Sequence, residues 1–134
     1  MIAVDSSVVI AGFASWHEQH PVAGKVLAQQ PRLVSHAAIE TFSVLTRLPP
    51  PHRAPADLAG RFLRSRFPQP LLCLPAGRYA DLVAMLAAKQ IVGGRVYDAL
   101  VGFTAAEHGA TLVSLDRRAS LIYEAVGARV ELPG

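Results

Sequence analysis

Acidic residues are the side chains of this 134-residue sequence whose positions suggest chemistry. The sequence has only ten of them, and four fall where strands are expected to end or helices to begin. These four residues are Asp5, Glu40, Asp98 and Asp116. Four carboxylates in one cleft repel one another, so either protons or a cation must accompany them. Hard divalent cations prefer oxygen ligands, whereas zinc usually recruits His or Cys, so the set suits Mg²⁺ or Mn²⁺.

A metal ion held by carboxylates is suited to hydrolysing phosphodiester bonds, because it polarises the phosphate and lowers the pKa of the water it binds. The other charges agree with an anionic substrate: the net charge is +3, and arginine provides 11 of the 13 basic residues. Arginine binds phosphate through a bidentate fork, although an arginine-rich composition can equally reflect genomic bias. The sequence contains no Walker loop, dinucleotide glycine motif or Ser-His-Asp order.

Asp5 and Asp116 each follow an apolar run, residues 1–4 and 110–115, that is typical of a buried strand. In a parallel α/β sheet the carboxyl ends of the strands lie at one edge, where ligands bind. Both aspartates also precede helical stretches, so each is suited to capping a helix N-terminus as well. The chemical and the capping interpretations both stay open from these residues alone.

Glu40 and Asp98 are expected in the first two turns of two helices, residues 36–48 and 96–106. An acid near a helix start is ordinary, because the helix dipole favours it. Asp98, however, lies among apolar residues on a helix that is apolar on almost every face. This setting favours a functional role for Asp98 over a structural one.

The order of the expected elements predicts an α/β fold of three layers, α/β/α, around a central parallel sheet of about five strands. Strands are expected near residues 1–4, 32–34, 71–74, 110–115 and 128–132. The length is usual for one domain and no linker or repeat interrupts the chain, so residues 1–134 are expected to form a single domain.

Two expectations concern burial. Cys73 stands in the apolar run Leu71–Leu74 and is expected to be a buried thiol. The helix predicted over residues 77–90 is expected to bury one apolar face. That face consists of Tyr79, Leu82, Val83 and Leu86.

The sequence predicts a soluble protein of the cytoplasm. No apolar run reaches the ~18 residues that a bilayer crossing needs. The first strand begins at residue 1, so we expect no leader, and the single cysteine has no internal partner for a disulfide.

The neighbourhoods of all four acids resemble the motifs of one known family. The matching stretches are Asp5–Val8, Ser35–Glu40 with Val44 and Leu45, Asp98–Ala99 and Gly109–Asp116. They are similar to those of PIN-domain proteins and, more narrowly, of VapC-type toxins of bacterial type II toxin–antitoxin pairs. The resemblance extends over nearly the whole chain, and it implies a PIN fold.

The resemblance also implies a function. It implies a Mg²⁺-dependent endoribonuclease, with Mn²⁺ as another possible metal, that hydrolyses RNA phosphodiester bonds and halts growth. The catalytic and metal-binding residues would be Asp5, Glu40, Asp98 and Asp116, supported by the hydroxyls of Ser6 and Ser114. The implied partners are RNA, a second copy of the chain in a homodimer, and a VapB-type antitoxin whose tail blocks the acids.

RNA contacts are expected from basic and aromatic residues near the acids in sequence. The basic candidates are Arg95, Arg117 and Arg118, which would contact the RNA backbone. Trp16 and Tyr97 are candidates for stacking on bases, although an ordinary surface role is as probable for each.

Three other functions compete with the nuclease. A phosphohydrolase of the haloacid dehalogenase type needs a second aspartate two residues after the first, where Ser7 stands. A receiver-like signalling domain needs an acid pair ahead of the first-strand aspartate, and Asp5 leaves no room for it. The third alternative is a catalytically silent PIN-like module that binds RNA or a protein partner.

Overall fold

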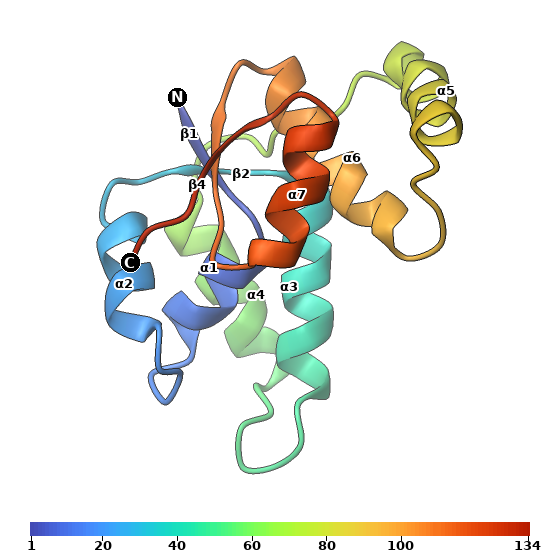
Figure 1. The fold of residues 1–134 in the computed structure, drawn as a ribbon. Coiled ribbons are helices and arrows are strands. Elements are labelled where there is room, and N and C mark those ends of the chain that lie inside the picture. The colour runs from blue at the N-terminus through green and yellow to red at the C-terminus, as the bar shows by residue number, and fades with distance from the viewer.

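The computed structural model describes residues 1–134 and contains a parallel sheet with helices on both faces (Figure 1). The four strands are β1 (Ile2–Val4), β2 (Arg32–Leu33), β3 (Thr111–Val113) and β4 (Arg129–Glu131). Their spatial order is β2-β1-β3-β4, with β1 and β3 side by side in the centre. These two strands are short apolar runs because helices cover both of their faces. The expected three-layer α/β/α fold is confirmed.

The outer crossovers fix which helices cover which face. Helices α1 (Ser6–Phe13) and α2 (His20–Leu27) connect β1 to β2, and α7 (Arg117–Ala125) connects β3 to β4. The two connections run in opposite directions along the sheet. Because parallel crossovers are right-handed, they place α1 and α2 on one face and α7 on the other.

The long connection from β2 to β3 holds the remaining helices. They are α3 (Ser35–Arg47), α4 (Ala56–Arg66), the single 3-10 turn η1 (Ala76–Arg78), α5 (Tyr79–Lys89) and α6 (Arg95–Glu107). Helix α3 packs against α1, α4 and α6 and so joins the two ends of the molecule. None of the helices combines the length and hydrophobicity that a membrane crossing requires.

The prediction of a fifth strand over residues 71–74 is wrong in extent, because this segment forms only one isolated bridge, between Leu72 and Val34. Its side chains still alternate as in a strand: Leu72 and Leu74 are buried, whereas Leu71 and Cys73 are exposed. The expected burial of Cys73 is therefore also wrong. The apolar run predicted burial correctly, but the alternation along it turns the thiol outward.

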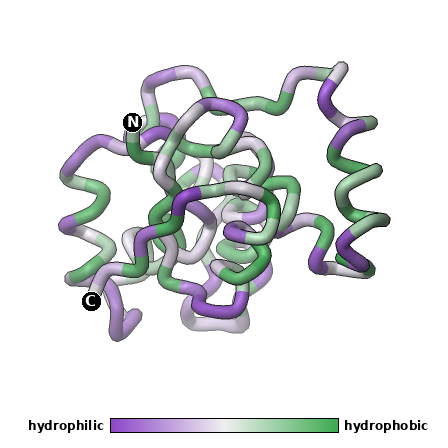
Figure 2. Tube along the Cα trace, turned by 45° about the horizontal axis from the view of Figure 1, so that its top comes forward, coloured by the Kyte–Doolittle hydropathy of each residue, from purple (hydrophilic) through white to green (hydrophobic).

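Helix α5 stands apart from the sheet at one side of the molecule (Figures 1 and 2). Only Leu82 of its expected inward face is fully buried, and Tyr79 and Val83 are 46% and 63% exposed, so that expectation is corrected. Figure 2 shows hydrophobic and hydrophilic turns alternating along this helix. The helical period predicted an apolar face correctly, but no element of the chain covers most of it.

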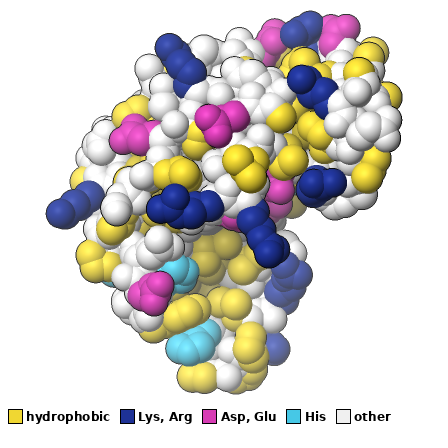
Figure 3. Space-filling model, in the orientation of Figure 1, with side chains coloured by type: hydrophobic (Ala, Val, Ile, Leu, Met, Phe, Trp, Pro, Cys, Tyr) yellow, Lys and Arg dark blue, Asp and Glu magenta, His cyan; other side chains and the backbone are white.

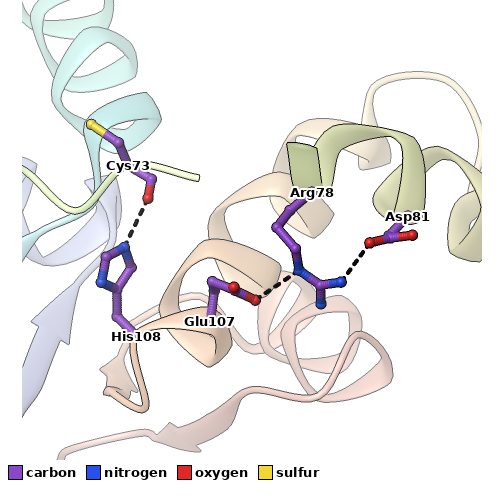
Figure 4. A network of polar contacts seen from close by, with 5 residues as sticks. All are labelled: Cys73, Arg78, Asp81, Glu107 and His108. Atoms are coloured by element: carbon purple, nitrogen blue, oxygen red, sulfur yellow. Dashed lines mark hydrogen bonds and ion pairs between the residues drawn. The ribbon is translucent and has the colours of Figure 1, made fainter. Parts of the chain in front are cut away.

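A polar network secures the junction between α5 and α6 (Figure 4). The guanidinium of Arg78, the last residue of η1, pairs with Asp81 in the first turn of α5 and with Glu107 at the end of α6. The same guanidinium lies 5.2 Å from the ring centre of Phe103. His108 adds a hydrogen bond of 2.8 Å to the carbonyl oxygen of Cys73. These contacts hold the base of α5 while its outer face stays open.

Helices α6 and α7 approach each other closely at Gly102. A Cβ atom added to Gly102 would lie 2.8 Å from the Cα atom of Tyr123, which is backbone and cannot move aside alone. Glycine at this position therefore sets the distance between the two helices, and with it the position of Tyr123.

We expect Gly102→Ala to destabilise the protein by about 1–3 kcal/mol, because the added methyl group forces α6 and α7 apart. Chemical denaturation measures this change. Gly24→Ala in α2 is the control, because a Cβ atom there meets nothing within 4 Å, and alanine in a helix interior stabilises by roughly 0.5–1 kcal/mol. Equal stability of the wild type and Gly102→Ala would contradict the tight contact.

Candidate active site

Asp5 is a buried carboxylate, 2% exposed, between the end of β1 and the start of α1. Both of its oxygens accept hydrogen bonds. Oδ1 accepts from the Ser7 hydroxyl at 2.5 Å and from the Val8 amide at 3.3 Å. Oδ2 accepts from the Ser114 hydroxyl at 2.6 Å and from the Tyr123 hydroxyl at 2.8 Å. Burial raises the pKa of Asp5, and these four donors oppose that rise.

The two serine hydroxyls also hold the chain that follows β3. Ser7 Oγ accepts a hydrogen bond of 2.8 Å from the Leu115 amide, and Ser114 Oγ accepts one of 3.0 Å from the Asp116 amide. Each hydroxyl therefore donates to Asp5 and accepts from the backbone at the β3 edge. The carboxyl ends of β1 and β3 are fixed to each other through these two side chains.

Ser114 lies where the sequence placed it, but the partner expected of Asp5 near the N-terminus is Ser7 and not Ser6. The Ser6 hydroxyl makes no hydrogen bond to Asp5. Asp5 is the N-cap of α1, so the first helical residue points away while the second turns back toward the cap. Asp5 is therefore both the N-cap of α1 and a buried carboxylate at the end of β1.

Tyr123 is a site residue that sequence reasoning missed. It is 3% exposed and reaches Asp5 from α7, 118 positions along the chain. Burial next to Asp5 raises the pKa of its hydroxyl strongly, so Tyr123 stays a neutral donor. The only signal in the sequence is its spacing of seven from Asp116, which places both residues on one side of the last helix.

The other three expected acids surround Asp5 at the same sheet edge. Asp116 caps α7, its Oδ1 accepting from the Arg118 and Ala119 amides at 3.0 and 3.1 Å. Burial raises the pKa of Asp98, and the charges of Asp116 and Asp5 raise it further. Burial also raises the pKa of Glu40, to about 7, with smaller effects of Asp98 and Asp5. The charges of Asp5 and Asp98 thus reach Glu40, and those of Asp5 and Asp116 reach Asp98.

Glu40 and Asp98 differ from Asp5 in their lack of protein donors. Neither carboxylate accepts a hydrogen bond, and the nearest cation to Glu40 is the His36 ring, 4.0 Å away. Burial lowers the pKa of His36 and so disfavours its charged form. The His36 ring stacks on Tyr97, with ring centres 5.4 Å apart. Glu40 and Asp98 are therefore two half-buried carboxylates that no hydrogen-bond donor of the protein neutralises.

Basic side chains lie beside the acids. Arg117 and Arg118 line an open cavity of about 400 Å³ that also includes Ser7 and Asp116. Arg118 and Arg95 line a second cavity of about 330 Å³ on the other side. Figure 3 shows Lys and Arg side chains around a hollow on this face, with acidic atoms visible between them. Arg117 and Arg118 thus lie beside Asp116, and Arg95 shares the second cavity with Arg118.

Comparisons with known proteins agree with this geometry. The model of the PIN domain family matches residues 2–125. The chain belongs to the PIN-domain family. It is 48% identical over 132 residues to Ribonuclease VapC40 of two Mycobacterium tuberculosis strains, a match that covers 98% of each chain. It is 45% identical over 131 residues to Ribonuclease VapC27 of the same species, covering 96% of this chain and 94% of that protein. Within the PIN domains it is therefore of the VapC ribonuclease type.

The donor set of this PIN domain fits a hard divalent cation. No group of three or more His, Cys, Asp or Glu side chains is arranged so that it could hold a metal ion by itself. The carboxylates that lack protein donors, Glu40 and Asp98, are open to a cation, and their oxygens are the ligands that a hard cation prefers. Asp5 contributes its charge from a fixed position, because both of its oxygens are already held.

The raised pKa of Glu40 makes the metal-free protein less stable as the pH rises. Its folded-state pKa is about 7 against an ordinary value of 4.5, so the folded state binds more protons between these values. The contribution of Glu40 is fully present below the lower value and is lost as the pH rises through the upper one. We expect Glu40→Gln to flatten this decline, as measured by chemical denaturation in EDTA at a series of pH values.

Glu124→Gln is the matched control for Glu40→Gln, because Glu124 is an exposed acid on α7, away from the cluster. It should leave the pH dependence of the unfolding free energy unchanged. If wild type and Glu40→Gln lose stability in parallel over this range, Glu40 does not carry an uncompensated charge.

Proposed function

We propose that this PIN domain is a metal-dependent endoribonuclease and that Asp5, Glu40, Asp98 and Asp116 form its catalytic, metal-binding site. The observation that supports this most is the pair of uncompensated carboxylates, Glu40 and Asp98, whose pKa values are raised by burial and by the neighbouring acids. Carboxylates with pKa values perturbed in this way are typical of functional sites, and a bound cation would relieve their repulsion.

Each side chain has a distinct role in the proposed reaction. Asp98 and Glu40 hold Mg²⁺ or Mn²⁺, which supplies Lewis-acid polarisation of the scissile phosphate when bound. The four donors to Asp5 favour its charged form against the effect of burial and hold it in place beside the cation. Asp116 keeps one oxygen free beside its capping bonds and orients the attacking water.

The arginines at the rim complement the acids. Arg95, Arg117 and Arg118 are exposed beside the two cavities and take part in no ion pair with an acid of the chain. Guanidinium groups in this setting bind the phosphates that flank the scissile bond. They also reduce the repulsion between the RNA backbone and the acid cluster.

The biological role that we propose is that of the toxin in a type II toxin–antitoxin pair, acting in the cytoplasm. Both relatives carry the name VapC, which supports a VapB-type antitoxin as the partner. We further propose a homodimer. The exposed apolar side chains of α5, such as Val83, are available for a protein contact of that kind.

The proposed site predicts that Asp98→Asn abolishes RNA cleavage while the protein stays folded. The amide has no charge to hold a cation, so the loss should be at least about a hundredfold, as expected for removal of a metal ligand. The measurement is cleavage of total cellular RNA by the purified protein with Mg²⁺, with Mn²⁺ and with EDTA.

Asp57→Asn is the matched control for this loss, because Asp57 is an exposed acid on α4 that pairs only with Arg61. It should cleave like the wild type. Cleavage that persists in EDTA or in Asp98→Asn would refute the metal-dependent mechanism, and no cleavage by wild type would favour the catalytically silent alternative.

A second prediction follows from the charges alone and needs no RNA. Excess Mg²⁺ should raise the melting temperature of wild type by stabilising the folded state, by about 2.7 kcal/mol at a concentration a hundred times the dissociation constant. The Asp98→Asn protein should melt higher than wild type in EDTA, because repulsion is relieved, and should respond little to Mg²⁺. An equal response of both proteins would place the cation elsewhere.

A further inference from the structure

The open cavity beside the acid cluster continues away from the acids. Ser7 and Asp116 form its inner end, and His17 and Gln19, from the segment between α1 and α2, lie on its lining together with Arg117 and Arg118. Its volume of about 400 Å³ is in the range of small-molecule sites. Most of its lining is polar, so an apolar ligand does not suit it.

An exposed aromatic pair stands next to this cavity. Trp16 precedes His17, and its ring centre lies 6.0 Å from that of His17 and 4.1 Å from that of His52. The planes of Trp16 and His52 are tilted by 35°. Trp16 is nevertheless 50% exposed. An indole that is braced on a second ring and still half open to solvent offers a flat surface to a further ring.

The polar atoms of the cavity match a phosphate and sugar. Nδ1 of His17 accepts a hydrogen bond of 3.1 Å from the Gln19 amide, so the ring proton is on Nε2 and this nitrogen is a donor. Arg117 and Arg118 add two guanidinium groups that pair with no acid of the chain. The cavity therefore gathers donors and positive charge between the acids and the aromatic pair.

We propose that this cavity and the Trp16–His52 pair bind an unpaired nucleotide of the RNA next to the cleaved bond. The phosphate contacts Arg117, Arg118 and His17, and the base stacks on Trp16. The inference rests on the proposed ribonuclease function and extends it, because it names the residues that hold the nucleotide next to the cleaved bond and the side of the acid cluster along which the strand runs.

The arrangement favours single-stranded RNA over a duplex and over a protein partner. A base can stack on an indole only when it has left its neighbours, as it does in a loop or a single strand. A protein partner would be expected to cover an apolar surface, whereas two free arginines and polar side chains line the cavity that holds His17, the neighbour of Trp16, and Asp116.

Trp16 is the only tryptophan of the chain, so its fluorescence reports on this surface alone. The experiment titrates Asp98→Asn protein, which does not cleave, with a short oligoribonucleotide as a single strand, as a duplex with its complement, and as an abasic strand. We expect saturable quenching by the single strand and much weaker quenching by the other two. His52→Ala should reduce the quenching, because the indole loses its support.

Variants separate stacking from a structural role. In the Asp98→Asn background, Trp16→Ala should weaken binding of a labelled single strand, measured by fluorescence polarisation, by about fivefold or more, and Trp16→Phe should restore most of it. Tyr79→Ala is the control, because Tyr79 is an aromatic residue of similar exposure, 46%, on α5. It should bind like the parent, and all variants should keep the parent's melting temperature.

The outcomes distinguish this inference from the proposed function. If the single strand leaves Trp16 fluorescence unchanged and Trp16→Ala binds normally, the stacking site is refuted even though wild type cleaves RNA. A change in Trp16 emission with protein concentration in the absence of RNA would assign this surface to a protein contact and also refute it. Quenching by RNA without any cleavage by wild type would support the binding site and refute the nuclease.

Discussion

The burial of the Asp5 carboxylate is the constraint on which the site depends. A charge removed from water is stable only when hydrogen bonds replace the lost solvent. Asp5 receives them from the start of α1, from the residue after β3 and from α7. The need to satisfy one side chain thus fixes the relative positions of three elements. Asp116 lies between two of them, whereas Glu40 and Asp98 come from α3 and α6.

Glu40 and Asp98 differ from Asp5, because the protein does not satisfy their carboxylates with hydrogen bonds. Their oxygens have no protein donor, and their pKa values are raised by burial and by the charges of nearby acids. A protein selected only for stability would neutralise or pair such groups. Leaving them unpaired next to a firmly held carboxylate keeps a strong negative potential ready for a cation, at some loss of stability in its absence.

The sequence predicted the acids and the three layers because both follow from local patterns. Apolar runs ending in aspartate predict strand ends, and parallel topology brings those ends together. It could not predict that Tyr123 reaches Asp5, since that contact depends on how closely α6 and α7 approach at Gly102. Nor could the sequence predict that Ser7, and not Ser6, donates to Asp5, because this depends on how the first helical residues turn.

The errors elsewhere have a common physical origin. The run at Leu71–Leu74 and the apolar face of α5 have the periodicity of buried elements, yet Cys73 and Val83 are exposed. Periodicity predicts which residues share a face, but it does not say whether another element of the same chain covers that face. Helix α5 lies at the edge of the molecule, so part of its apolar face stays exposed.

The donors to Asp5 come from both ends of the chain, and this has a consequence for synthesis on the ribosome. Asp5 and Glu40 are translated early, but Asp98, Ser114, Asp116 and Tyr123 follow much later in the sequence. A nascent chain that ends before β3 has no partner strand to hold Asp5 and no α7 to close the edge. We therefore expect the arrangement of the acids around Asp5 to form only after α7 has been translated.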